Sequence, residues 1–205
     1  MGSNVESPSF HNWYKANKQK SDWPYLLIME GEDNEQGYWF FLECMKGNKE
    51  CLNKDVLTIA ALVNSTKMIM YKSYFEKDYP KILELAAYQQ PKLALQYLYS
   101  FIVARNDLVT FCCKKEPRYA LHFLLDFLAT NVDLFVECIK AAPEYAFSHD
   151  KVLNLLRKKK SKQIIYDIAQ ACPDYCLDKL SELLGKYYPT LIDSCITILE
   201  QRSKS

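Results

Sequence analysis

A pattern of apolar and polar positions occurs four times in the second half of the chain, and each copy begins at a proline. The copies read Pro-Lys-Leu-Ala-Leu, Pro-Arg-Tyr-Ala-Leu, Pro-Glu-Tyr-Ala-Phe and Pro-Asp-Tyr-Cys-Leu, starting at Pro91, Pro117, Pro143 and Pro173. The prolines are 26, 26 and 30 residues apart. A sequence that resembles itself at such a period is typical of stacked helical repeats.

Apolar residues on both sides of each proline follow helical spacing. In the second copy, Cys112-Cys113 precede Pro117, and Ala120, Leu121 and Leu124 follow it, as expected for buried helical faces. Because proline is tolerated in the first turn of a helix, each repeat is predicted to be a helix beginning at proline, a short turn and a second helix. Turns are expected at 105–107, 130–131 and 160–162, with helix N-caps at Asn106 or Asp107 and at Ser161.

The third repeat departs from the others. It is four residues longer, and Asp150 stands where the first two repeats have Leu98 and Leu124. After the fourth repeat, the apolar pattern of residues 190–199 is followed by a polar tail from Gln201. We expect a capping helix there.

These patterns predict an all-α protein: a right-handed stack of antiparallel helix pairs, or α-solenoid, with repeats of about 26 residues. The array and its capping helix are predicted to occupy residues 79–205. Residues 21–78 are predicted to form N-terminal helices that pack on the array, and residues 1–20 a mobile arm. For residues 22–47 both two helices and a hairpin fit; helices are favoured because 55–63 and 67–75 continue in helical style.

Composition supports a folded helical protein. The 205 residues are 49% hydrophobic and 14% aromatic, and five glycines and eight prolines leave little material for the turns of an all-β fold. No stretch reaches the roughly 18 uninterrupted apolar residues that suggest a membrane span. The eight cysteines form no Cys-x-x-Cys pair, and Cys112, Cys113, Cys138, Cys172, Cys176 and Cys195 occupy positions where alanine would also fit. We therefore expect structural thiols and a reducing, cytoplasmic compartment.

Over roughly residues 65–200 the chain resembles the short-helix α-solenoids, the broad group that contains tetratricopeptide and HEAT-type repeats. It lacks the Trp and Leu-Gly of the tetratricopeptide signature, and its repeat is shorter than the 34 residues of that family. The resemblance implies a role in scaffolding or in recognition of another protein.

Two stripes on the repeats are candidate partner-binding residues. Positions two and six after each proline form an aromatic row, and interface hot spots favour tyrosine. Positions one and five pass from basic to acidic along the array, which could orient a bound protein. Packing between helices is the alternative for the first stripe, and a solvated helix face for the second. The candidates are Tyr97, Arg118, Tyr119, His122, Phe123, Tyr145, His149, Tyr175 and Asp178.

Other motifs carry little chemistry. Residues 32–43 have the spacing of an EF-hand loop, but Glu32 and Gln36 replace its usual short acids, which favours an acidic turn between helices. The basic run at 157–160 falls in the last turn of a predicted helix, where lysines oppose the helix dipole. The three histidines show no metal spacing, and no phosphate loop or nucleophile elbow occurs, so no cofactor, metal or catalytic residue is predicted.

The resulting hypothesis is a non-enzymatic helical-repeat module that binds another protein and regulates or scaffolds it. Two alternatives are an enzyme whose active site is assembled between distant helices and an RNA-binding helical repeat. With 26 basic and 25 acidic residues, the net charge of +1 lacks the basic excess of a dedicated nucleic-acid binder. Lysine outnumbers arginine 22 to 4, as is common in AT-rich genomes, including those of intracellular bacteria and some viruses. The hypothesis therefore includes a role in a host cytosol, as a delivered effector or as the regulator of one. The sequence does not indicate an oligomeric state.

Overall fold

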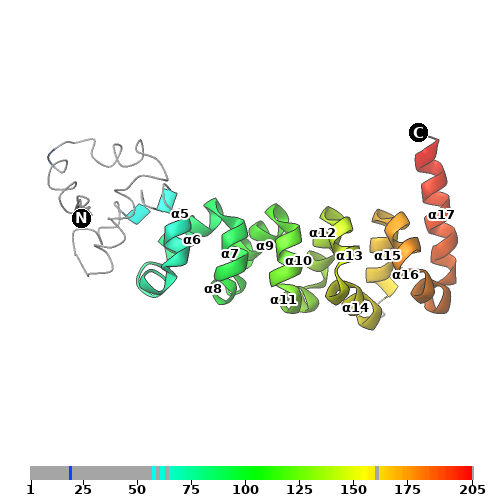
Figure 1. Cartoon of the computed structure of the whole chain (residues 1–205), viewed down its shortest axis with the longest axis horizontal. Coiled ribbons are helices and arrows are strands. Elements are labelled where there is room, and N and C mark those ends of the chain that lie inside the picture. The colour runs from blue at the N-terminus through cyan, green and yellow to red at the C-terminus, as the bar shows by residue number, and fades with distance from the viewer. Residues whose placement is uncertain (1–18, 20–56, 59–60, 63–64, 160–161, 205) are drawn as a thin grey trace, which may run out of the picture. The chain divides into compact units, whose positions relative to one another are not determined.

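The structure is a computed structural model of the whole chain (Figure 1). It describes residue 19 and residues 57–58, 61–62, 65–159 and 162–204. Thirteen α-helices and one short 3-10 helix account for the elements in these ranges, and no strand occurs among them. The predicted all-α class is confirmed. The predictions for residues 1–20, residue 19 apart, and for residues 22–47, including the EF-hand-like spacing, lie outside the described residues.

The chain divides into two compact units, Met1–Phe101 and Ile102–Ser205. In the first unit, the helix α5 (Ser65–Met70) packs on α6 (Pro80–Gln89) and α7 (Pro91–Tyr97). A 3-10 helix, η1 (Lys72–Tyr74), follows α5, and α8 (Tyr99–Val103) crosses the boundary between the units. The ammonium group of Lys72 donates a hydrogen bond to the carbonyl oxygen of Tyr97 at the end of α7.

The second unit arranges its helices in two rows. Helices α9, α12 and α15 form one row, in which α12 contacts both of the others, and α10, α13 and α16 form the other, in which α13 contacts both of the others. Helix α17 packs on α16 and α15. The bounds are α9 Asn106–Lys115, α10 Pro117–Phe123, α11 Leu125–Thr130, α12 Val132–Ala141, α13 Pro143–Ser148, α14 Asp150–Lys159, α15 Lys162–Ala171, α16 Pro173–Tyr187 and α17 Pro189–Ser203.

A single residue before each proline joins one helix to the next. Glu116 (φ −131°, ψ 60°), Ala142 (φ −139°, ψ 59°) and Cys172 (φ −131°, ψ 59°) share nearly the same backbone conformation. The clash of the proline ring with the preceding residue disfavours the helical conformation there, so the earlier helix ends. The proline then starts a new helix without losing a hydrogen bond, because the first N–H groups of a helix have no partner within it.

A similar backbone conformation precedes two further prolines that the sequence pattern did not include, although only the second of them directly joins two helices. Helices α6 and α17 begin at Pro80 and Pro189, after Tyr79 (φ −133°, ψ 50°) and Tyr188 (φ −144°, ψ 56°). Neither proline is followed by a small residue three positions on, which is why the repeat motif did not identify them.

The prediction of one helix after each of the first three repeat prolines is wrong, because the structure has two helices there. Leu98 (φ −113°, ψ 30°) separates α7 from α8, and Leu124 (φ −112°, ψ 19°) separates α10 from α11. Both leucine side chains are fully buried. In the third repeat the break falls one residue earlier, at His149 (ψ 108°), and Asp150 starts α14. The extra length of this repeat is in α14, which has 10 residues where α11 has 6.

The chain breaks at the turns predicted at 105–107 and 130–131, but both breaks are shorter than predicted: residues 104–105 separate α8 from α9, and Asn131 alone separates α11 from α12. The N-cap prediction at Asn106 or Asp107 is wrong. Helix α9 already begins at Asn106, so the N-cap position belongs to Arg105, which makes no side-chain capping hydrogen bond. Ser161, the other predicted N-cap, lies outside the described residues. The basic run does fall at the end of a helix, since α14 ends at Lys159.

The cysteines inside the helical patterns are buried free thiols, as predicted for Cys112, Cys113, Cys138, Cys172, Cys176 and Cys195. Burial raises the pKa of Cys112 to about 12. Burial also raises the pKa of Cys176, while a hydrogen bond with Cys138, followed by burial, raises that of Cys113. These thiols therefore resist ionisation and act as small apolar groups in the core.

Helix α17 is longer than the predicted 190–199 and reaches Ser203. Its Arg202 guanidinium donates to the carbonyl oxygens of Gln170 (3.4 Å) and Ala171 (3.5 Å), at the end of α15. The last carbonyl groups of α15 thus gain a cationic donor, as is favourable at a helix C-terminus. None of the helices described here combines the length and apolar character that crossing a membrane requires.

Candidate partner-binding site

The candidate site lies where α10 and α13 meet on the surface of the second unit. Helix α10 buries Ala120 and Leu121, so residues one turn apart on its other side reach solvent. There the rings of Tyr119 and Phe123 stack at a centroid distance of 6.3 Å with an interplanar angle of 13°. The side chain of His122 is exposed and packs edge-on against Phe123 at 4.6 Å.

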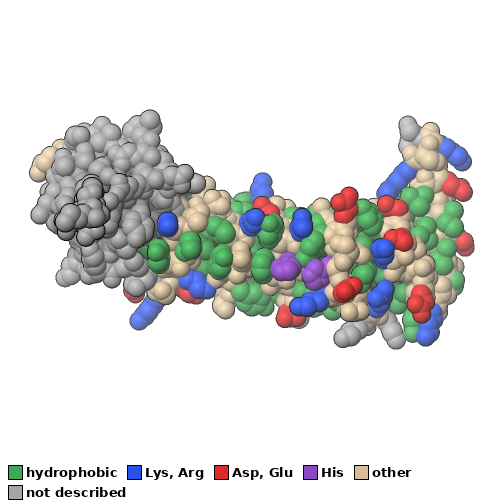
Figure 2. All heavy atoms as spheres, in the orientation of Figure 1, with side chains coloured by type: hydrophobic (Ala, Val, Ile, Leu, Met, Phe, Trp, Pro, Cys, Tyr) green, Lys and Arg blue, Asp and Glu red, His purple; other side chains and the backbone are tan. Residues whose placement is uncertain are grey.

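Helix α13 presents Tyr145 to this cluster. Oη of Tyr145 and Nδ1 of His122 are hydrogen-bonded at 2.7 Å; in the histidine tautomer that carries its proton on Nε2, the phenol donates. His149, immediately after α13, has its ring 5.1 Å from that of Tyr145 and 5.7 Å from that of His122. Figure 2 shows the two described histidines side by side on this face. Three of the side chains thus join two helices that are separate in sequence.

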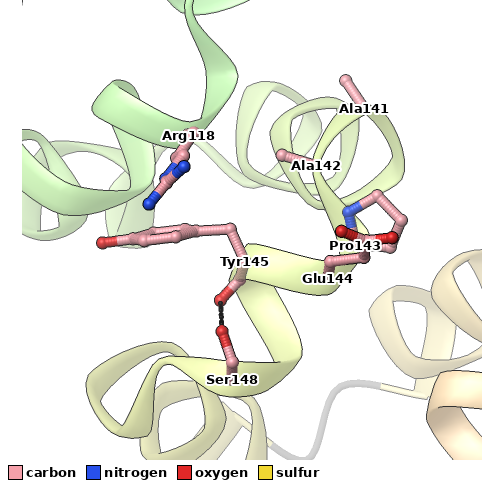
Figure 3. Close-up of a pocket in the computed structure, with 7 residues that line it drawn as sticks. All are labelled: Arg118, Ala141, Ala142, Pro143, Glu144, Tyr145 and Ser148. Carbon is pink, nitrogen blue, oxygen red and sulfur yellow. Dashed lines mark hydrogen bonds between the residues drawn. The ribbon is translucent and has the colours of Figure 1, made fainter.

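Arg118 completes the cluster as a cation stacked on an aromatic ring. Its Cζ atom lies 5.1 Å from the centroid of the Tyr145 ring. The close-up in Figure 3 shows the guanidinium group facing this ring. The Arg118 side chain is exposed, and no carboxylate forms an ion pair with it among the described residues. Stacking holds the guanidinium plane while its N–H groups stay available for a ligand.

Two adjoining pockets share the side chains of Arg118 and Tyr145, and we call them the paired pockets. One, of about 500 Å³, is also lined by the α12–α13 junction, Glu144 and Ser148 (Figure 3). The other, of about 320 Å³, is also lined by Tyr119, His122 and Phe123. Ser148 Oγ donates a hydrogen bond to the carbonyl oxygen of Tyr145 at 3.1 Å, and the side chain of Tyr145 lines both pockets.

Five of the nine candidates from the sequence therefore line the paired pockets, namely Arg118, Tyr119, His122, Phe123 and Tyr145, and a sixth, His149, packs against two of them. Tyr175 lies next to them on α16 and stacks on Phe147 of α13 at 5.4 Å. Asp178 pairs with Lys179 (2.9 Å) and lines a different pocket together with Arg157. Tyr97 belongs to the first unit, where 48% of its surface is exposed.

One polar atom at the site is unsatisfied. Nδ1 of His149 is buried and has no hydrogen-bond partner within the described part of the chain. No group of three or more His, Cys, Asp or Glu side chains is placed to hold a metal ion in those ranges. What the cluster offers is aromatic surface, a stacked cation and a histidine edge, which suit binding of a partner group by contact and charge.

The stacked pair predicts a measurable coupling. Burial raises the pKa of Tyr145, and the nearby Arg118 cation opposes this by favouring the phenolate. We expect Arg118→Gln to raise the pKa of Tyr145 further, measured from the Cζ chemical shift in protein carrying ¹³C-labelled tyrosine. Lys151→Gln, which removes a cation from α14, should leave it unchanged. An unchanged or lowered Tyr145 pKa in Arg118→Gln would contradict the stacked geometry.

No known protein-family model, curated protein or solved structure matches the chain. Its function is therefore inferred from the geometry of the second unit.

Proposed function

We propose that this protein is a non-enzymatic α-solenoid that binds another protein, to regulate or scaffold it, and that the paired pockets are part of its binding face. The solenoid, a right-handed stack of antiparallel helix pairs, is supported by the two rows of helices in the second unit and by the repeated proline junction. A stacked array leaves the edges of its helices free along one face, and such faces commonly bind proteins.

The observation that carries the proposal is the exposed cation of Arg118 stacked on the ring of Tyr145, between two pockets. Arginine and tyrosine are enriched among the residues that dominate binding energy at protein interfaces. Their mutual stacking, and the hydrogen bond between Tyr145 and His122, fix these side chains before a partner arrives. Less conformational entropy is then lost on binding.

A peptide or protein is favoured over RNA by the charges around the site. Glu144 lines the same pocket as Arg118, and Asp174 follows on the next helix of the row. Carboxylates along the path of a nucleic-acid backbone would repel its phosphates, whereas a protein can place a basic group beside them. We propose a reducing compartment, the cytoplasm or a host cytosol, because the described cysteines are free and buried.

The test is capture of a partner by the tagged full-length chain from native and candidate-host lysates. The variant Arg118→Glu/Tyr145→Ala removes the stacked pair, and Lys151→Glu/Tyr166→Ala makes the same kinds of change elsewhere on the second unit, at an exposed lysine and an exposed tyrosine. We expect the wild type and the control to retain the same protein. The double variant should lose it by at least about tenfold, as for loss of an interface hot spot.

Far-UV circular dichroism and urea midpoints of all three proteins separate lost contact from lost folding. If none of the three proteins captures a specific partner, the proposed function is contradicted. If Arg118→Glu/Tyr145→Ala captures the partner as well as the wild type does, the binding face does not include the paired pockets.

A further inference from the structure

Charge is polarised along the row of helices that contains the paired pockets. The basic end is α10, with the exposed guanidinium of Arg118. The acidic end is formed by Glu144 of α13 and Asp174 of α16, both exposed. Because α13 contacts both α10 and α16, these charges follow one another along adjacent helices of a single row.

The two carboxylates are close to the same phenol. Burial raises the pKa of Tyr175, and the charges of Glu144 and Asp174 raise it further. The ring of Tyr175 stacks on Phe147 at an interplanar angle of 18°, which ties α16 to α13 at this position. The acidic end is thus one patch made by two helices, as the basic end is one patch made around α10.

We infer that this row binds a linear peptide segment of the partner protein, with an acidic residue at the paired pockets and basic residues over Glu144 and Asp174. The inference rests on the proposed function and names the chemistry of its partner. An acidic side chain is the complement of Arg118, whose stacked guanidinium presents fork-like N–H donors to a carboxylate. An aromatic residue next to the acid suits the pocket lined by Tyr119, Phe123 and Tyr145.

The spacing of the peptide charges follows from the helix row. Packed helices lie about 8–10 Å apart, and an extended chain advances about 3.3 Å per residue. One helix of the row therefore corresponds to about three peptide residues. With the acid at Arg118, we expect basic residues about three and six positions away, over Glu144 and Asp174. The direction of the peptide is decided by testing both orders.

The experiment uses two synthetic amidated nine-residue peptides and the full-length protein. They are Gly-Glu-Phe-Ala-Lys-Ala-Ser-Lys-Gly and its reverse, Gly-Lys-Ser-Ala-Lys-Ala-Phe-Glu-Gly. A control of identical composition, Gly-Lys-Phe-Ala-Glu-Ala-Ser-Lys-Gly, moves the acid to the middle. Binding affinity is followed in the ¹⁵N NMR spectrum by the backbone amide signals in every variant, and contact with the site by the side-chain Nε–Hε signals of the protein's four arginines where Arg118 is present. Comparison with Arg118→Lys assigns the Arg118 signal.

We expect one of the two orders to shift the Arg118 signal with saturation at millimolar peptide or below, and the control peptide to bind at least about fivefold more weakly. Glu144→Gln/Asp174→Asn should weaken the favoured peptide about threefold or more. Arg118→Glu should weaken binding of the favoured peptide about tenfold. When lysine replaces the glutamate of that peptide, however, the Arg118→Glu protein should bind it more tightly than the wild type does. Lys151→Glu makes the same charge change on α14 and should leave the affinity within about twofold.

Any of three results would overturn the inference. They are equal binding of the control peptide, equal losses of affinity in Arg118→Glu and Lys151→Glu, and no shift of the Arg118 signal with either order at 2 mM peptide, which is roughly the weak limit of such contacts. If the peptides fail while the lysate partner is still lost only by Arg118→Glu/Tyr145→Ala, the charge pattern is wrong and the binding module stands. If no lysate partner is captured either, the proposed function falls with it.

Discussion

Truncation of Phe135 to alanine is expected to lower the free energy of unfolding by about 3–5 kcal/mol. Phe135 has no exposed surface and is among the largest fully buried side chains described. Its helix, α12, packs against both neighbours in its row, α9 and α15, and also against α10. The cavity left by the ring would be bounded by several short helices, none of which is long enough to be stable alone in water.

Urea denaturation at 25 °C, followed by circular dichroism, measures this effect. Phe135→Leu keeps most of the volume and should cost only about 1.5 kcal/mol or less. Ile196→Ala on α17 removes a side chain that is 44% exposed and should cost less than about 1 kcal/mol. A loss below about 1.5 kcal/mol for Phe135→Ala would mean that α12 is not at the centre of this packing.

Thiol labelling is expected to show the second large effect. In a Cys44→Ser/Cys51→Ser variant, only the six described cysteines remain, all of them buried. For a thiol whose pKa rises from 9.0 to about 12, as that of Cys112 does, the thiolate fraction at pH 8 falls about 1000-fold. We therefore expect a disulfide reagent at pH 8 to label Cys112 at least about 1000-fold more slowly in the native protein than in denaturant.

The same variant, unfolded in guanidinium chloride, provides the reference rate for six accessible thiols. Near-UV and far-UV circular dichroism of the native sample establish that the two serine substitutions leave the fold intact. Reaction of several thiols within seconds under native conditions would contradict the burial of these cysteines.

The helical class and the proline boundaries were predictable because proline acts locally. Its ring restricts the residue before it and supplies the first turn of the next helix, whatever packs around it. The breaks at Leu98 and Leu124 were not predictable in this way. Residues 94, 95, 98, 101 and 102 fit one continuous helical stripe, and all are buried on both sides of the break. Hydrophobic periodicity predicts which residues are buried. It does not predict a break between two helices that bury the same stripe of residues.

The candidate site was predictable in part for a similar reason. Fixed offsets from the prolines brought Arg118 and Tyr145 into the same cluster because α10 and α13 begin with the same junction. Asp178 follows the same rule of offsets but lies in α16, which continues unbroken to Tyr187, so its surroundings differ. The buried Nδ1 of His149 depends on the early break after α13, which has no counterpart in the other repeats.

The one-residue junction also bears on how the length of this chain can change. The segment from Pro117 to Ala142 starts after Glu116 and ends at Ala142, and these two residues differ by only 8° in φ and 1° in ψ. Its first residue is a proline, and so is the residue that follows its last. If this segment were duplicated, both ends of the new copy would therefore join the chain through a backbone conformation that already occurs at its junctions. Whole repeats can then be inserted or deleted as units, and the row of α10, α13 and α16 can gain or lose one helix without a new kind of junction.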